Sequence, residues 1–468
     1  LWDRKNHVLS SARDRMGEKP LYYGWQNGVF LFGSELTALR KHDAFEDVIN
    51  RKIIPSYLKT GAISAPNSIY EGIYKVMPST YIKITANSDK KIMPEATYYW
   101  SLDEIARNGV KSPLTENVDE LIEGLEELIN QSVSLQTISD VPLGAYLSGG
   151  IDSSLIVALL QSNSMKKVKT FTRGFEEKKY DESMYAQSVA DYLGTDHTRM
   201  FLTKQEIIRD ITETQGVYDE PLSDTSASLR VANLAKKDVK VALCGDGGDE
   251  LFAGYSHYSK IGKISKIIDA FPDVIRPVIS KIGTSLPSKL ITVASEPFMK
   301  LFKISTATPL GLKIHKLAKI FNIRDHNVLY NIVKTSGMIE ESLVNKEYVE
   351  IDNNNYSMNN FDNIIDTMLF CDQRDLLSSD ILVKSDRNSM SVGIENRAPL
   401  LDHRIVEMAW KFPLDIKIHN GVAKWPLRQI LHKYVPARLV DRPKMGFGIP
   451  AEAWLRGPLK SWASDLLS

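Results

Sequence analysis

The stretch VPLGAYLSGGIDSS, residues 141–154, decides the fold of this chain. Its apolar first half, Val141–Leu147, predicts a buried strand, and two glycines then lead into a predicted helix, Ser153–Gln161. Strand and helix signals alternate beyond it: strand 168–175, helix 181–193, helix 226–237 and strand 239–244. Apolar strands that alternate with helices form a parallel sheet with helices on both faces. The sequence therefore predicts an α/β fold, which becomes mostly helical from about residue 260.

The loop Leu147–Ser154 (LSGGIDSS) lies between the first strand and its helix, where α/β sheets bind phosphates. Paired glycines let the backbone approach an oxyanion and turn its N–H groups inward. Ser148, Ser153 and Ser154 add hydroxyl donors. The carboxylate of Asp152 would repel a bare phosphate, but it would bind a Mg²⁺ ion that lies between the carboxylate and the phosphate. No Gly-Lys-Ser/Thr follows, so this is not a Walker A loop; the alternative is a glycine-rich turn with a serine cap and no ligand.

A second glycine-rich loop, Cys244–Tyr255 (CGDGGDELFAGY), follows the predicted strand 239–244. Its three carboxylates within five residues repel one another unless cations or donors neutralise them. They indicate either a second cluster of Mg²⁺ ligands or an exposed acidic turn that caps a helix. The first loop resembles the pyrophosphate loop of the ATP pyrophosphatases, and neighbouring strand ends face one crevice. We therefore expect Asp152 and Asp249 to share Mg²⁺ bound to ATP. The residues expected to line the nucleotide pocket beside them are Leu147, Thr172, Arg173, Gly174, Cys244 and Gly245.

Charged residues recur among apolar ones from about residue 380 onward, and one group lies in Arg442–Pro450 (RPKMGFGIP). The resemblance of the first loop implies cleavage between the α- and β-phosphates. Breaking that bond builds negative charge on pyrophosphate, which a positioned Lys or Arg stabilises. Lys444, beside a glycine-containing loop, is the natural candidate. The structural alternatives are a buried ion pair between Arg397 and Asp402 and a surface charge at Arg442.

The first hundred residues have a different pattern, with short alternating strands separated by turns. The segment Gln26–Gly28 lies between two strand-like runs, 21–24 and 29–32, and predicts a hairpin. The segment Asn108–Asn117 is polar and lacks periodicity. We therefore place a domain boundary there, with a β-rich domain at 1–107 and the α/β domain at 118–468.

Composition narrows the classes of function. Lys+Arg and Asp+Glu both number 58, which gives no reason to expect a nucleic-acid or anionic-membrane partner. No apolar run reaches the roughly 18 residues that a membrane span requires. The two cysteines, Cys244 and Cys371, cannot form a disulfide framework for a chain of 468 residues. We therefore expect a cytoplasmic protein that acts on small molecules and binds neither nucleic acid nor a membrane.

The loop Leu147–Ser154 resembles the pyrophosphate loop of the ATP pyrophosphatases, whose pattern is Ser-Gly-Gly-x-Asp-Ser. Further segments occur in the order of the glutamine-dependent asparagine synthetase family, and the chain resembles that family over most of residues 120–455. The matching segments are Leu147–Ser154, Tyr180–Ser183, Leu193–His197, Tyr218–Pro221, Val241–Tyr255, Ser385–Asp402 and Arg442–Pro450.

The resemblance implies roles for individual residues. Asp152 and Asp249 would bind Mg²⁺, and Lys444 would assist adenylation. The residues that would hold pyrophosphate are Ser148, Gly149, Gly150 and Ser153. Asp246 occupies a position where many members carry Glu, a carboxylate linked to the intermediate and to incoming ammonia, so the shorter side chain is a departure. Glu395 would lie on the amino-acid side of the pocket.

The reaction implied by the resemblance is an ATP-dependent amidation by a ligase that forms C–N bonds. The side-chain carboxylate of aspartate attacks the α-phosphate, which gives β-aspartyl-AMP and pyrophosphate. Ammonia, supplied by glutamine hydrolysis in the complete protein, then gives asparagine and AMP. Two alternatives remain open: amidation of another carboxylate in a surface-polysaccharide or natural-product pathway, and a non-catalytic nucleotide-binding relative. A homodimer is compatible with the resemblance.

The segment Arg13–Tyr23 (RDRMGEKPLYY) resembles the second half of the family's glutaminase domain. In the family that domain begins with a catalytic cysteine, whereas this sequence begins with Leu1 and has no cysteine before Cys244. We therefore expect 1–107 to be the C-terminal part of an Ntn-type glutaminase domain, both ends of the chain to be truncated, and no glutaminase activity from this chain.

Overall fold

The computed structural model describes residues 1–85, 88, 92–175, 181–203, 206, 216–223, 228–272, 274–285, 318, 320, 321, 323, 326, 328–330, 361–442, 454–457 and 459–467. The described residues divide into two compact units, one within 1–254 and 370–468 and the other within 255–338 and 354–369. The predicted role of Lys444 lies outside the described residues. No helix in the described part of the chain is both long and apolar enough to cross a membrane.

The β-rich start of the chain contains two antiparallel sheets, with strand orders β1-β2-β6-β7 and β4-β3-β5. The strands are β1 (Trp2–Asp3), β2 (Val8–Ala12), β3 (Tyr22–Gln26), β4 (Val29–Gly33), β5 (Ile73–Lys75), β6 (Thr80–Thr85) and β7 (Thr97–Tyr98). The helical segments among them are α1 (Leu36–Leu39), a 3₁₀ turn (Arg51–Ile53) and α2 (Ile54–Thr60). The prediction of a β-rich region before the parallel sheet is confirmed.

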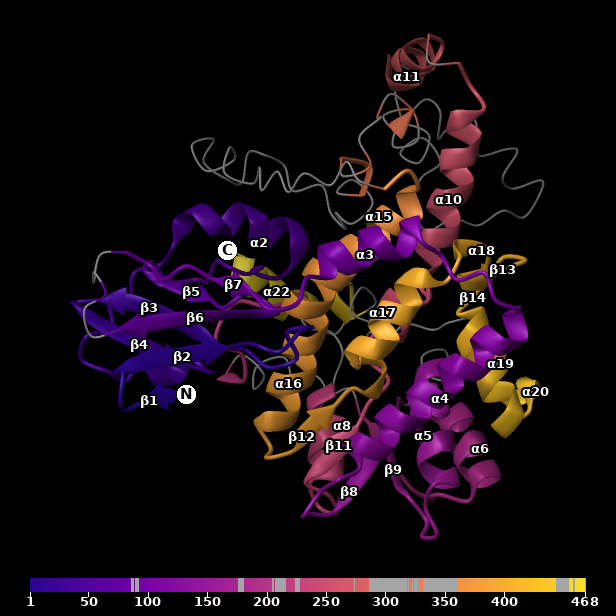
Figure 1. The fold of residues 1–468 in the computed structure, drawn as a ribbon, viewed down its shortest axis with the longest axis horizontal. Coiled ribbons are helices and arrows are strands. Elements are labelled where there is room, and N and C mark those ends of the chain that lie inside the picture. The colour runs from indigo at the N-terminus through magenta and orange to yellow at the C-terminus, as the bar shows by residue number, and fades with distance from the viewer. Residues whose placement is uncertain are drawn as a thin grey trace. The chain divides into compact units, whose positions relative to one another are not determined.

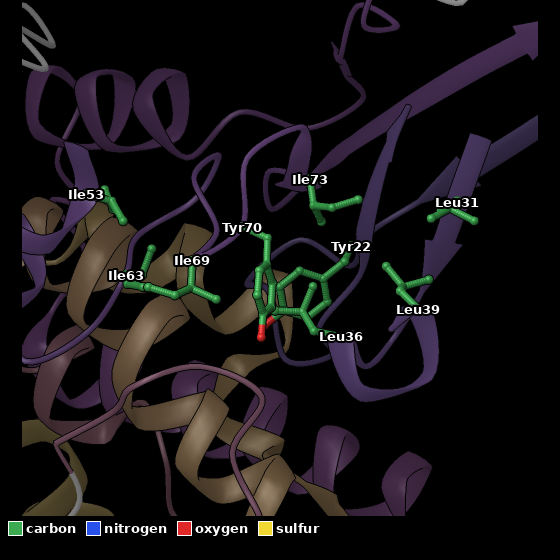
Figure 2. Packing of buried hydrophobic residues seen from close by; sticks show 9 residues of the cluster. All are labelled: Tyr22, Leu31, Leu36, Leu39, Ile53, Ile63, Ile69, Tyr70 and Ile73. Atoms are coloured by element: carbon green, nitrogen blue, oxygen red, sulfur yellow. The ribbon is translucent and has the colours of Figure 1, made fainter. Parts of the chain in front are cut away.

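The predicted hairpin is confirmed by the pairing of β3 with β4. Gln26 pairs with Val29 across a two-residue turn in which Asn27 and Gly28 have φ of 48° and 73°. Left-handed backbone at both turn residues matches the twist of the strands. Figure 2 shows the hydrophobic core that packs against this hairpin, to which α1 and the segment before β5 contribute side chains. Its buried side chains are Tyr22, Leu31, Leu36, Leu39, Ile53, Ile63, Ile69, Tyr70 and Ile73.

A five-stranded sheet with the order β10-β9-β8-β11-β12 forms the centre of the α/β region, and every neighbouring pair in it is parallel. Its strands are β8 (Leu143–Tyr146), β9 (Lys169–Phe175), β10 (Asp196–Leu202), β11 (Val241–Leu243) and β12 (Glu395–Arg397). The chain builds β8, β9 and β10 outward in one direction and then returns to place β11 on the other side of β8. The strand order therefore reverses between β8 and β11, the point where open α/β sheets bind their ligands.

Two groups of helices cover this sheet. Helices α5 (Ile151–Ser162) and α6 (Ser183–Leu193) contact β8, β9 and β10, whereas α8 (Ser228–Ala235) and α16 (Leu382–Met390) contact β9 and β12. Figure 1 shows the first group, with α4 (Val118–Gln136), on one side of the sheet and the second group on the other. The predicted α/β fold with a parallel sheet is confirmed.

The remaining helical segments come mostly from the C-terminal part of the chain. They are α3 (Leu102–Lys111), α9 (Gly248–Leu251), α15 (Ile364–Cys371), a π-helical segment (Asp372–Ile381), a 3₁₀ turn (Pro399–Leu401), α17 (His403–Lys411), α18 (Leu414–Lys417), α19 (Trp425–Tyr434), α20 (Ala437–Val440) and α22 (Lys460–Leu467). A short hairpin pairs β13 (Ile418–His419) with β14 (Val422–Ala423). In the second unit, α10 (Ser256–Asp269) and α11 (Arg276–Ser285) are the longest described helices.

The structure differs from the sequence expectation at two kinds of place. Strands β10 and β12 were not predicted as strands, because neither has the apolar run of a buried strand. The polar segment Asn108–Asn117 is not a linker throughout, because its first four residues are the last turn of α3. At Gly109 in that turn, a Cβ would lie 2.7 Å from the carbonyl carbon of Trp410, so helix α3 packs closely against α17.

Candidate active site

Two loops leave the same edge of the parallel sheet, one on each side of the reversal point. Leu147–Ser154 follows β8 and the loop from Cys244 follows β11, and these strands pair with Val241 opposite Leu143. Because parallel strands end at one edge, the two loops face each other. This arrangement agrees with the expectation drawn from the alternating strands and helices.

The first loop is held in shape by its own side chains. The hydroxyls of Ser148 and Ser153 lie 2.8 Å apart, and the Gly150 amide donates to Ser148 Oγ at 3.2 Å. Gly149 has φ +70°, and a Cβ there would lie 2.6 Å from the Ala186 amide nitrogen, so only glycine fits. The loop ends at the N-terminus of the 12-residue helix α5, whose first amides and dipole favour an anion. Ser154, in contrast, is fully buried.

The second loop approaches the first more closely than side chains would allow. A Cβ on Gly248 would lie 2.4 Å from Asp152 Oδ1, and one on Gly245 would lie 2.8 Å from the Ser153 amide nitrogen. Gly247 adopts φ +96°, in the left-handed region. The glycines of this loop therefore serve to bring the carboxylate of Asp249 to the same place as that of Asp152.

A lysine that the sequence did not assign joins these two carboxylates. Lys424 Nζ lies 2.7 Å from Asp249 Oδ1 and also contacts Asp152 Oδ2. The three side chains are 8%, 19% and 15% exposed, respectively. Burial by itself lowers the pKa of Lys424, but the charges of Asp152 and Asp249 outweigh it and raise that pKa above its ordinary value. The lysine is therefore an ammonium ion at neutral pH.

The residues at this point fit a Mg²⁺ ion that arrives with ATP. Asp152 and Asp249 converge on one cation, as two ligands of a shared metal would. No group of three or more His, Cys, Asp or Glu in the described ranges could enclose a metal by itself. Mg²⁺ is commonly bound by one or two carboxylates together with substrate phosphates. A carboxylate pair without a full protein cage is therefore the expected donor set.

Asp246 lies apart from this pair and has partners of its own. Its Oδ2 accepts hydrogen bonds from Ser385 Oγ at 2.8 Å and from Cys244 Sγ at 3.2 Å. Burial raises the pKa of Asp246, against the hydrogen bonds from Ser385 and Cys244, which lower it. Asp246 lines a cavity of about 10 Å³, which is room for roughly one water-sized molecule. Glu18 and Lys19, from the β-rich part of the chain, line the same cavity.

The other residues predicted for the nucleotide pocket lie around the two loops. Leu147 is buried, and its amide donates to Phe171 O at 3.0 Å. The guanidinium of Arg173, on β9, lies 5.3 Å from the ring centre of Phe175. Cys244 is buried, and burial raises the pKa of its thiol well above the ordinary value. Cys244 is therefore a buried, neutral packing residue at the start of the second loop.

Glu395 is not brought to this site. It pairs with Val241, the first residue of β11, so it lies at the amino end of the sheet, opposite the loops. Its carboxylate is 49% exposed and accepts from Arg397 Nε at 2.8 Å. The family resemblance of the segment Ser385–Asp402, which contains Glu395, suggested this residue, but the direction of β12 places it at the other end of the strand.

Two structural alternatives from the sequence are also wrong. Arg397 does not pair with Asp402, because Arg397 binds Glu395 and Asp402 binds Arg404 at 2.8 Å. Arg442 is not a surface charge. It is mostly buried and pairs with Glu182 at 2.9 Å.

The segment Tyr218–Pro221, which the sequence matched without a role, joins the α/β region to the β-rich part. Glu220 accepts from Lys75 Nζ at 2.5 Å and from the Ile69 amide at 2.8 Å. Asp219 accepts from Arg387 at 2.7 Å and from the Thr37 amide at 2.9 Å. These carboxylates therefore hold the two parts of the first unit together.

Comparison with known proteins gives matches along the whole chain. The family described as Asparagine synthase matches residues 124–468, and the one described as Glutamine amidotransferase domain matches residues 1–100. Asparagine synthetase (glutamine-hydrolyzing) 1 of Bacillus subtilis (strain 168) is 29% identical, with all of this chain and 70% of that protein covered. A putative asparagine synthetase (glutamine-hydrolyzing) of Mycobacterium tuberculosis (strain ATCC 25618 / H37Rv) is 28% identical, covering 99% and 68%. Putative asparagine synthetase (glutamine-hydrolyzing) 2 of Methanocaldococcus jannaschii is 34% identical over 66% of this chain and 58% of its own.

Proposed function

This chain belongs to the asparagine synthase family of ligases, whose chemistry is ATP-dependent amidation, and we propose that it converts aspartate to asparagine through β-aspartyl-AMP. ATP is the activating substrate and Mg²⁺ its metal partner. The products of the first step are β-aspartyl-AMP and pyrophosphate. The products of the second step, in which ammonia attacks the acyl carbon, are asparagine and AMP.

The observation that carries this proposal is the convergence of Asp152 and Asp249 on one cation beside the Ser148–Ser153 loop. It lies at the reversal point of a parallel sheet, next to a helix N-terminus. A loop of amides for an anion and a carboxylate pair for a divalent cation are together what Mg·ATP requires. The geometry supports binding of Mg·ATP, and the match to the asparagine synthase family favours its use in amidation over binding alone.

The residues of the chain would act in the following way. Amides of the loop at Gly149 and Gly150 and the hydroxyls of Ser148 and Ser153 would hold the departing pyrophosphate. Mg²⁺, when bound by Asp152 and Asp249, would neutralise charge on the phosphates. Lys444 is proposed, from the sequence, to stabilise the charge that builds as the phosphate bond breaks. A carboxylate accepts an amine only after its oxygen becomes a good leaving group, and adenylation provides that.

Nitrogen delivery is proposed to occur on the side of Asp246. That side adjoins the β-rich part of the chain, which matches the amidotransferase domain, and it contains the cavity lined by Glu18 and Asp246. In the family arrangement, glutamine hydrolysis would supply the ammonia. Asp246, with its pKa raised by burial, is the group we place near the incoming nucleophile.

The test is an assay of pyrophosphate release with ATP, Mg²⁺, ammonium and a panel of carboxylic acids. Release with aspartate, and formation of asparagine detected by mass spectrometry, is the expected result. Release with a sugar acid or a peptide-like acid but not with aspartate would redirect the proposal to another acceptor. If no acid in the panel gave release, a non-catalytic nucleotide-binding role would replace it.

A further inference from the structure

Lys424 is held at the active edge by its backbone as well as by its charge. It immediately precedes α19 and has φ 55°, a left-handed conformation that residues other than glycine seldom adopt. Its amide donates to the carbonyl of Phe252, within the second loop, at 3.1 Å. A non-glycine residue keeps this unfavourable backbone conformation only where contacts with its surroundings hold it there. The fold therefore fixes the point from which this side chain extends.

Two glycines leave the space that the Lys424 ammonium and its carboxylate partners occupy. Gly254 closes the second loop, and a Cβ there would lie 1.9 Å from Lys424 Cε and 2.1 Å from Asp249 Oδ1. Gly248, in the same loop, leaves room for the carboxylate of Asp152, because a Cβ there would lie 2.4 Å from Asp152 Oδ1. Two glycines thus make the space in which one ammonium meets two carboxylates.

The ammonium occupies the point where both proposed metal ligands converge. Its nitrogen contacts an oxygen of Asp152 and lies 2.7 Å from an oxygen of Asp249. A Mg²⁺ ion bound by both carboxylates needs that same space and repels a neighbouring positive charge. Lys424 and the metal therefore exclude each other.

We propose that Lys424 is a tethered cation that occupies the place of Mg²⁺ between Asp152 and Asp249 until the metal arrives with ATP. The proposal rests on the proposed function for the identity of the metal. Before ATP binds, the ammonium neutralises two carboxylates that would otherwise repel each other and part the loops. It also keeps free Mg²⁺ from binding alone, because the metal must displace a buried ion pair without the help of phosphate oxygens. Lys424 is thus a positioning residue that couples metal binding to nucleotide binding.

Binding of metal in the absence of nucleotide tests this directly. We expect wild-type protein to show no rise in Tm with Mg²⁺ alone. Lys424→Met, a neutral side chain of similar length, should gain a rise of about 2–4 °C at millimolar Mg²⁺, since ligand that binds only the folded state stabilises it. Mn²⁺ binding followed by calorimetry should be at least about tenfold tighter in Lys424→Met than in wild type, because a like charge at contact distance opposes the metal.

Matched variants keep the test specific. Lys433→Met removes an exposed lysine from α19, the helix that Lys424 precedes, and should behave like wild type. Lys424→Arg keeps the positive charge and should still exclude the metal. Adding Asp249→Asn to Lys424→Met should abolish the gained Mn²⁺ binding, which places that binding at this carboxylate pair. If Lys424→Met does not fold, Lys424→Gln supplies a neutral side chain that can still donate hydrogen bonds.

Equal binding of Mn²⁺ by wild type and by the neutral variants would overturn the proposal. These measurements need no turnover, so they separate this inference from the proposed function. A contrast in metal binding without pyrophosphate release would support the tethered cation and contradict the ligase reaction. Pyrophosphate release without the contrast would do the reverse.

Discussion

Lys424 and Lys75 are both buried lysines that pair with carboxylates, yet their surroundings serve different ends. Lys75, in the β-rich part, pairs with Glu220 and also donates to the Ile63 carbonyl at 2.5 Å. Glu220 in turn accepts a backbone amide hydrogen bond, so the pair is bound into the main chain on both sides. Such a pair holds two parts of the molecule together.

Lys424 differs because its carboxylates come from two separate loops at the ligand edge of the sheet. Glycines of the second loop form the space around the ion. A cation shared between two loops can be exchanged for another cation without unfolding either loop. The comparison teaches that burial and charge alone do not separate a structural ion pair from a functional one; the origin of the partners does.

The largest expected effect is a loss of catalysis when either carboxylate that binds Lys424 is removed. Asp152→Asn and Asp249→Asn should each reduce pyrophosphate release by at least about 100-fold, because each removes charge that the transition state needs. Asp238→Asn, which removes an exposed carboxylate paired with Lys169, serves as the control and should remain close to wild type. Near-normal turnover in either active-edge variant would show that the two carboxylates do not share a catalytic metal.

The next largest effect is a loss of stability when Lys75, the structural lysine, is replaced. Lys75→Met should destabilise the fold by about 3–5 kcal/mol in denaturant unfolding, because Glu220 would remain as a buried, uncompensated charge. Pyrophosphate release per folded molecule should change by less than about twofold, since the sites are independent. Adding Glu220→Gln should recover much of the lost stability. A large loss of turnover with unchanged stability would reverse the assignment of the two lysines.

A third prediction concerns pH. Burial raises the pKa of Glu18 from 4.5 to about 8, and Asp14 adds to the shift. The folded state therefore holds this proton more tightly, and the stability it contributes below pH 4.5 is lost as the pH rises through about 8. Glu18→Gln should be more stable than wild type at pH 9 by roughly 1–3 kcal/mol and should differ little at pH 5. Glu123→Gln, at an exposed site, serves as the control and should have nearly the stability of the wild type at both pH values.

The smallest expected effect concerns Glu395, which lies outside the candidate active site. Glu395→Gln should alter the KM for the acceptor by less than about twofold, because Glu395 lies at the amino end of β12 and pairs with Arg397 on an exposed surface. Kinetics with aspartate as the variable substrate measure this. A rise in KM of tenfold or more without a change in kcat would return Glu395 to the substrate site.

Local sequence predicted much of this arrangement. The apolar strand before Leu147–Ser154 and the one before Cys244 were visible, and a parallel sheet requires that loops after neighbouring strands meet. The two carboxylates were therefore predictable as a pair. Strands β10 and β12 were missed because neither has a strong apolar run.

Contacts across long stretches of chain were not predictable. Lys424 reaches Asp152 across 272 residues, and Ser385 reaches Asp246 across 139, and nothing in either local segment names its partner. Glu395 was misplaced because its position depends on the direction and register of β12. Arg397 and Asp402 lie close in sequence, but each has a partner closer still.

Isotope transfer tests the central claim, adenylation of a carboxylate, most directly. Aspartate labelled with ¹⁸O in its side-chain carboxylate should be incubated with ATP, Mg²⁺ and ammonium, and the products analysed by mass spectrometry. Attack of the carboxylate on the α-phosphate predicts one labelled oxygen in AMP and none in pyrophosphate. Unlabelled AMP, or label in inorganic phosphate with ADP as the other product, would contradict the account.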